Sequence, residues 1–207
     1  MKGAGILGRW WSSGPRRVST LDGYARWAPM YPPRPHNPLM EAEAAIVGPL
    51  FRAAAPRRAL DVGTGTGRNL EMLRVAGAVT IVGLDLSPSM LFHGSGLFPL
   101  TCGDAQRLPF RSASFDLVSS SLMCGDLRDL DSWIAEASRV LARGGHLIYS
   151  DFHPEWSVAG WRRTFIGEDG RTYELPLHPH TIDDHVQLLK KHGMQVRAIR
   201  EPRIAGR

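Results

Sequence analysis

The sequence predicts an α/β fold, a doubly wound and mostly parallel sheet with helices on both faces. Short apolar runs alternate with helix-like segments between residues 58 and 150, which is the pattern of repeated strand–helix–strand units. A glycine-rich turn from Asp61 to Gly67 (DVGTGTG) follows the first run, and the acidic residue Asp85 comes directly after the second. A chain of 207 residues is long enough for one such domain with a buried core.

Five apolar runs are expected to form the strands of this sheet. They cover residues 58–62, 79–84, 98–102, a run that begins at Phe115, and 146–150. Runs that are apolar throughout are typical of strands that a parallel sheet buries on both faces. Helices are expected before and between them, and again after the last run, at residues 38–55, 67–75, 87–94, 130–141 and 181–191.

The start of three of these helices carries a capping signal. Asn37 stands before Pro38, and Ser87 stands before Pro88; each pair places a capping side chain ahead of proline at the first helical position. Thr181 is an equally good cap for the last helix. These signals fix where the helices begin better than the apolar periodicity does.

The two ends of the chain and one insertion depart from the alternating pattern. Residues 1–20 have no periodicity and are expected to be a disordered or flexible tail, leaving residues 21–207 as a single domain. Residues 152–180 are expected to form a cap or insertion after the fifth strand. Residues 194–200 are expected to form a sixth strand.

The charge distribution argues against a nucleic-acid partner. The first 40 residues contain six basic residues and one acidic residue, whereas the other 167 hold 19 of each sign. A nucleic-acid groove is expected to put a basic stripe on the folded domain itself. The basic character of this chain lies in its N-terminal stretch instead.

Composition also indicates in which compartment the protein is found and whether it binds a metal. No apolar run approaches the roughly 18–20 residues that a membrane-spanning helix needs, and residues 1–20 do not read as a secretory signal. We expect a cytoplasmic protein; the composition of residues 1–20 leaves an organellar transit peptide as the alternative. Two cysteines without metal-ligand spacing give no support for a zinc site, so no metal is expected.

The glycine-rich turn points to a particular cofactor class. A dinucleotide fingerprint has three glycines in the spacing G-x-G-x-x-G, but counting from Gly63 the third of these positions is Arg68. The spacing D-x-G-x-G-x-G, in contrast, is filled from Asp61 to Gly67. This segment resembles the first motif of the class I S-adenosylmethionine-dependent methyltransferases.

Three further segments carry the same resemblance in the same order. Asp85 ends the second strand, where a carboxylate can accept from both hydroxyls of a ribose. Residues 103–105 (Gly-Asp-Ala) resemble the adenine-binding segment of the family, and residues 139–145 (RVLARGG) resemble its helix and glycine pair before the fifth strand. Members of the family also have a seventh, antiparallel strand; residues 201–207 do not read as a strand, so this strand is expected to be missing here.

The resemblance implies a methyltransferase that transfers a methyl group from S-adenosylmethionine to an O, N or C nucleophile of a small molecule, releasing S-adenosylhomocysteine. The chain is similar to the small-molecule methyltransferases of quinone and biotin biosynthesis. Residues 21–36, which we call the N-terminal arm, contain Tyr24 and Tyr31, and these two residues could cover the cofactor. The other implied cofactor-binding residues are Asp61, Gly63, Thr64, Gly65, Gly67, Asp85, Leu86, Gly103, Asp104, Ala105 and Ser121.

Candidates for a general base follow the fifth strand. Asp151 and His153 should lie beyond the carboxyl ends of the strands, where doubly wound folds bind ligands. A base is needed only if the acceptor must lose a proton. Two other functions stay open: a non-catalytic S-adenosylmethionine-binding regulatory protein, and an RNA methyltransferase. The second lacks support because residues 119–124 (SSSLMC) stand where a Pro-Pro-Tyr box would be expected.

Overall fold

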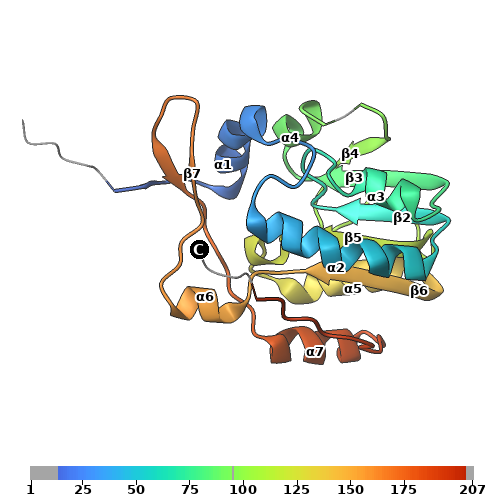
Figure 1. Ribbon diagram of the computed structural model, residues 1–207. Helices are drawn as coiled ribbons and strands as arrows, with labels where there is room; N and C mark the ends of the chain where they lie inside the picture. The colour runs from blue at the N-terminus through green and yellow to red at the C-terminus, as the bar shows by residue number, and fades with distance from the viewer. Residues whose placement is uncertain (1–13, 95, 204–207) are drawn as a thin grey trace, which may run out of the picture.

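In the computed structural model, which describes residues 14–94 and 96–203, the core is a parallel sheet of five strands (Figure 1). The strand order is β4-β3-β2-β5-β6, and all four neighbouring pairs are parallel. This confirms the predicted doubly wound fold. The strands are β2 (Arg58–Val62), β3 (Thr80–Asp85), β4 (Leu100–Cys102), β5 (Phe115–Ser121) and β6 (Leu141–Ser150).

Helices bury the two faces of this sheet in separate apolar clusters. On one side Phe51, Leu70 and Leu73 pack on Ala59, Ile81 and Leu117 of the strands. On the other side Trp133 and Ile134 pack on Leu60, Val62 and Val118, with Leu188 and Leu189 at the margin. The helices are α2 (Pro38–Ala54), α3 (Leu70–Val75), α4 (Pro88–Phe92), α5 (Leu130–Val140) and α7 (Ile182–Lys191).

The capping signals correctly mark the helix starts. Asn37 accepts a hydrogen bond from the N–H of Met40 at 2.9 Å, and Thr181 forms a reciprocal capping box with Asp184. The glycine pair at 144–145 does not end α5 as a separate turn. Instead, α5 leads directly into β6, whose pairing with β5 shifts register between Phe115 and Leu117, so the glycines lie within a bulge of the strand.

A small second sheet corrects the expectation of a tail over residues 1–20. β1 (Arg16–Arg17) pairs in parallel with β8 (Thr172–Glu174), which in turn pairs antiparallel with β7 (Thr164–Ile166). α1 (Thr20–Trp27) and η1 (Ala28–Met30) follow at once. Residues 16–17 are therefore held by strand pairing, which sequence periodicity cannot reveal in so short a segment. Residues 1–13 lie outside the described part of the chain.

The predicted insertion forms a cap that the N-terminal segment completes. We use "the cap" for the β1-β8-β7 sheet, α1 and α6 (Pro154–Val158). Trp27 stacks on Phe165 with ring centroids 4.8 Å apart, and Phe165 stacks on Tyr173. In Figure 1 the cap lies beside the end of the core sheet to which the strand arrows point. It therefore stands at the edge where ligands of such folds bind.

The prediction of a sixth strand at residues 194–200 is wrong. After α7 the chain has no strand among residues 192–203. In the family that the sequence resembles, this strand pairs with a seventh strand, and no described segment takes that position. A strand forms only where a neighbouring segment supplies partners for its backbone, so the alternating pattern of 194–200 is not sufficient.

No helix in the described ranges is long and apolar enough to cross a membrane.

Candidate functional site

The site is organised by the turn between β2 and α3, which has a backbone that only glycine adopts easily. Gly63, Gly65 and Gly67 have φ values of +68°, +58° and +87°. A Cβ on Gly63 would lie 2.5 Å from Cγ of Met123. The N–H of Thr64 donates to the carbonyl of Leu84 at 3.0 Å, which ties the turn to β3. The turn thus presents backbone rather than side chains at the strand ends.

Asp85 holds this turn from the neighbouring strand. Its Oδ2 accepts from the N–H of Gly65 at 2.7 Å, and its Oδ1 accepts from the N–H of Ser87 at 2.8 Å. Burial raises the pKa of this carboxyl group, although the two backbone donors act in the opposite direction. Each oxygen keeps a second lone pair that can accept from a hydroxyl group. The next residue, Leu86, leaves 47% of its surface exposed.

The Gly103-Asp104-Ala105 segment lies one strand further along the same edge. Asp85 pairs with Cys102 in the register of β3 and β4, and the N–H of Gly103 donates to the carbonyl of Asp85 at 3.0 Å. Asp104 Oδ1 accepts from the N–H of Gln106 at 2.8 Å, whereas Ala105 is buried. The structure therefore brings together the two segments that the sequence assigned to ribose and adenine.

Asp61 lies beneath the turn rather than at its surface. It is buried, and its Oδ1 accepts from Ser119 Oγ at 2.6 Å and from Asn69 Nδ2 at 3.4 Å. Asn69 also donates to Ser121 Oγ at 2.8 Å. Burial raises the pKa of Asp61. This carboxylate therefore positions the turn and links it to the end of β5, and Ser121 lies at the edge of the site.

A buried ion pair that the sequence did not predict lies beside the turn. Arg68 follows Gly67 directly, and its Nη1 lies 2.6 Å from Oε2 of Glu43 on α2; their side chains are 7% and 6% exposed. Glu43 also accepts through Oε1 from Ser150 Oγ at 2.5 Å. The sequence identified Arg68 only as a departure from a dinucleotide motif, and Glu43 sits in an apolar helical pattern without any signal.

The N-terminal arm reaches this part of the site through Tyr31. Burial raises the pKa of the Tyr31 hydroxyl to about 12, and the charges that act on it include those of Arg68, Glu43 and Asp85. Its ring meets Trp27 edge to face, with centroids 5.0 Å apart. Tyr31 thus packs against α1 through Trp27, and its role in covering the cofactor stays a prediction.

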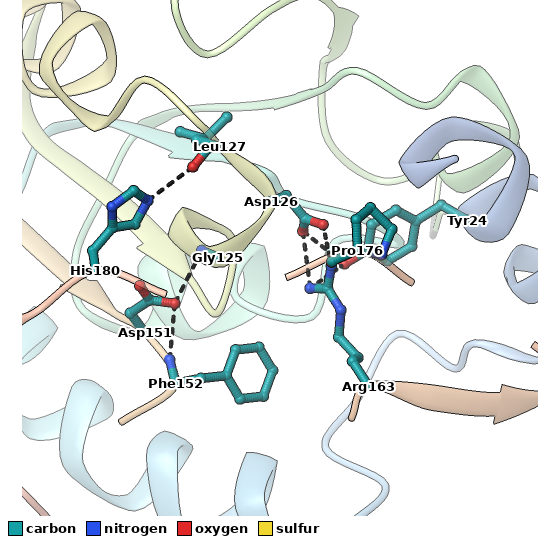
Figure 2. A network of polar contacts seen from close by, with 9 residues as sticks. All are labelled: Tyr24, Gly125, Asp126, Leu127, Asp151, Phe152, Arg163, Pro176 and His180. Atoms are coloured by element: carbon teal, nitrogen blue, oxygen red, sulfur yellow. Dashed lines mark hydrogen bonds and ion pairs between the residues drawn. The ribbon is translucent and has the colours of Figure 1, made fainter. Parts of the chain in front are cut away.

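Tyr24 belongs instead to a polar network that fastens the cap (Figure 2). Its hydroxyl donates to Asp126 Oδ2 at 3.0 Å, and Asp126 forms a buried ion pair with Arg163. Asp126 lies in η2 (Cys124–Asp126), directly after β5, and Arg163 also donates to the carbonyl of Pro176 at 2.8 Å. We call Tyr24, Asp126 and Arg163 the latch, because they join α1, η2 and the β7–β8 hairpin.

Asp151 lies at the end of β6, as predicted, and arranges the loops around it. Its Oδ1 accepts from the N–H groups of Gly125 and Phe152, at 3.1 and 2.8 Å (Figure 2). Its Oδ2 lies 3.5 Å from Nε2 of His185 on α7, and His185 Nδ1 lies 3.0 Å from the Tyr149 hydroxyl. His185 carried no motif in the sequence, and only the packing of α7 brings it here.

His153 follows β6, as predicted, and stands at the start of α6. Its Nδ1 accepts from the N–H of Glu155 at 3.3 Å, as the cap of α6, and its Nε2 lies 3.2 Å from Oε2 of Glu201. Both ring nitrogens therefore contact neighbouring residues, and the role of His153 as a base stays a prediction. A histidine directly before a proline can be a helix cap as well as a general base, and the sequence alone does not distinguish the two roles.

No group of three or more potential metal ligands occurs among the described residues. The strand edge presents backbone amides of the turn, carboxylates at the strand ends and one buried arginine–glutamate pair.

Comparisons with known proteins agree with this geometry. Residues 60–149 match the family model described as a methyltransferase domain. The chain is 41% identical over 110 residues to a demethylmenaquinone methyltransferase of Deinococcus radiodurans, covering 49% of this chain and 46% of the relative. It is 36% identical over 134 residues to a malonyl-[acyl-carrier protein] O-methyltransferase of Laribacter hongkongensis, covering 58% and 45%. The chain thus spans about half the length of the curated relatives it matches.

Solved structures show the same fold. An S-adenosylmethionine-dependent methyltransferase from Mesorhizobium loti superposes with a TM-score of 0.60 at 23% identity, covering 76% of this chain and 84% of that one. CalS10, an amino pentose methyltransferase from Micromonospora echinaspora solved with S-adenosylmethionine bound, gives a TM-score of 0.59 at 23% identity, covering 73% and 81%. Residues 60–149 therefore resemble a methyltransferase domain, and the chain has the fold of these solved S-adenosylmethionine-dependent methyltransferases.

Proposed function

We propose that the protein transfers a methyl group from S-adenosylmethionine to a small-molecule acceptor. The observation that carries the proposal is the fit between the β2–α3 turn and Asp85. Gly65 has a positive φ and donates its N–H to Asp85 at the end of the next strand. A turn without side chains lets a ligand approach the backbone closely, and the adjacent carboxylate is placed to accept from ribose hydroxyls.

The other strand ends fit the remainder of the cofactor. Gly103 and Asp104 follow β4 next to Asp85 and would meet the adenine, while Ser121 and the Asn69 amide would lie toward the methionine part. Asp61 supports the turn through Asn69, and Tyr31 would cover the bound cofactor. When bound, the cofactor supplies an electrophilic methyl group on a sulfonium. The chain supplies alignment, which accounts for much of the acceleration when the leaving group is already good.

The acceptor would lie beyond the strand ends, beneath the cap. The latch holds the cap to η2, and this closure would exclude water from the transfer. If the acceptor loses a proton, Asp151 Oδ2 and the His185 imidazole form the carboxylate–imidazole pair on this side. Oδ1 of Asp151 accepts hydrogen bonds from the N–H groups of Gly125 and Phe152. Asp151 therefore also positions the loop that the acceptor would touch.

The acceptors to be tested are suggested by relatives named demethylmenaquinone methyltransferase, malonyl-[acyl-carrier protein] O-methyltransferase and fatty-acid O-methyltransferase. The test incubates the protein with S-adenosylmethionine and one compound of each class: a naphthoquinol, a malonyl thioester and a long-chain carboxylic acid. Mass spectrometry should detect S-adenosylhomocysteine together with a product that has gained one methyl group. The proposal fails if the protein binds neither S-adenosylmethionine nor S-adenosylhomocysteine.

A further inference from the structure

The Arg68–Glu43 pair is poorly satisfied for a pair so deeply buried. Although Nη1 of Arg68 and Oε2 of Glu43 lie 2.6 Å apart, neither atom has a partner in hydrogen-bond geometry. The neighbouring Thr66 Oγ1 and Asn69 Oδ1 are also buried without a partner. A buried ion pair repays the loss of hydration only with good geometry and additional hydrogen bonds. The unpartnered atoms around the turn therefore point to a polar ligand.

The pair also lies at a defined place along the strand edge. Glu43 is bonded to Ser150 at the end of β6, and Asn69, next to Arg68, is bonded to Ser121 at the end of β5. Asp85, in contrast, ends β3, on the other side of β2. If the ribose lies at Asp85, the part of the cofactor beyond the sulfur extends toward β5 and β6, where the pair stands.

The chemistry of that part of the cofactor matches the pair. The methionine moiety ends in an α-carboxylate and an α-ammonium group, so it carries one charge of each sign. A guanidinium is a fork of donors suited to a carboxylate, and a carboxylate accepts from an ammonium group. Ser150 donates to Oε1 of Glu43, and Oε2 of Glu43 is left to face Arg68.

We infer that Arg68 binds the α-carboxylate and Glu43 the α-ammonium group of the methionine moiety, exchanging their mutual contact for the two charges of the ligand. The inference rests on the proposed function and deepens it. It assigns the cofactor's amino-acid end to a side-chain pair from α2 and the turn, in addition to backbone groups of the turn.

The test compares two ligands by titration calorimetry on the full chain. S-adenosylhomocysteine has the amino-acid end, whereas 5′-methylthioadenosine has the same adenosine and sulfur without it. Arg68→Met should weaken binding of S-adenosylhomocysteine by about 10- to 100-fold, the range of one to two charge-assisted hydrogen bonds, and leave 5′-methylthioadenosine unchanged. Glu43→Gln should act in the same selective way. Arg74→Met removes an exposed arginine paired with Glu71 on α3 and serves as the matched control.

Each outcome decides between the two claims. Equal losses for both ligands would make Arg68 a structural residue and overturn the inference, as would no loss for either. Should Arg68→Met fold poorly, the double variant Arg68→Met/Glu43→Met removes both charges together and must still lose S-adenosylhomocysteine selectively. Wild-type binding of 5′-methylthioadenosine but not of S-adenosylhomocysteine would refute the pair's role alone. Binding of neither ligand would refute the proposed function itself.

Discussion

At the scale of single residues, both the fold and the site depend on the absence of a side chain at Gly63. Gly63→Ala would have to adopt a left-handed backbone and place its Cβ 2.5 Å from Met123 Cγ. Gly144 has a similar φ of +78°, but nothing lies within 4 Å of its Cβ position. The two glycines therefore separate the cost of backbone strain from the cost of steric overlap.

We expect Gly144→Ala to lower the free energy of unfolding by about 1–2 kcal/mol through backbone strain. Gly63→Ala should lose a further 1–3 kcal/mol, roughly, because Met123 must move, and it should also weaken cofactor binding. Urea denaturation of both variants measures the difference. Equal losses for the two variants would show that Met123 does not constrain the turn.

Asp85 gives the site a pH dependence of a defined sign. In the proposed complex, ribose hydroxyls donate to the ionised carboxylate, and burial raises the pKa of this group above the ordinary value of 3.8. Lowering the pH should therefore weaken binding of S-adenosylhomocysteine. The loss should begin at a higher pH than it would for an aspartate with the ordinary pKa. In Asp85→Asn this component should disappear, which calorimetry over a pH series measures. An unchanged pH profile in the variant would contradict the assignment.

The same shift acts on stability in the opposite direction. A raised pKa means that the folded protein binds this proton more tightly than the unfolded chain does. Considered alone, protonation of Asp85 therefore stabilises the ligand-free fold as the pH falls. Affinity and stability should thus respond with opposite signs to the titration of this one group.

At the scale of elements, the latch determines how the cap is held. Arg163 and Asp126 are 5% and 9% exposed, and removing one partner of a buried pair leaves an uncompensated charge. Asp126→Asn should therefore lower the unfolding free energy by about 3–5 kcal/mol. The double variant Arg163→Met/Asp126→Leu should be considerably closer to wild type, because both charges are gone.

Arg162→Met is the matched control for the latch. Arg162 pairs with Glu174 in the same hairpin, but its side chain is 55% exposed, so its loss should cost less than about 1 kcal/mol. Chemical denaturation followed by tryptophan fluorescence reports on Trp27 and Trp161 of this region as well as on the buried core Trp133. An Asp126→Asn variant as stable as Arg162→Met would show that the latch does not hold the cap.

The elements also show how far the sequence can be read. The β2–α3 unit, Asp85 and the Gly103–Ala105 segment were predictable because a turn, a strand end and their spacing are local properties. Arg68 with Glu43, and Asp151 with His185, were not, since each pair joins distant segments. The same reason explains both errors in the fold: residues 16–17 form a strand only because β8 accepts them, and residues 194–200 do not because no described segment does.

At the scale of the whole molecule, sheet order converts a linear series of motifs into one continuous site. The order β4-β3-β2-β5-β6 places the Asp104 segment, Asp85, the glycine turn, Ser121 and Ser150 along a single edge. The N-terminal arm and the insertion after β6 then meet over that edge through the latch and the aromatic stack at Trp27. The strand-end residues of the proposed cofactor site all come from this one edge, and α2 adds Glu43.

The most direct measurement is a calorimetric titration of the full chain with S-adenosylhomocysteine, beside Asp85→Ala. We expect one binding event per chain in the wild type. The variant should bind about 10- to 100-fold more weakly, because hydrogen bonds to a charged acceptor are lost, while Asp183→Ala, an exposed acidic residue on α7, leaves the affinity unchanged. A wild-type chain that does not bind the ligand, or an Asp85→Ala variant that binds it equally well, would contradict the account.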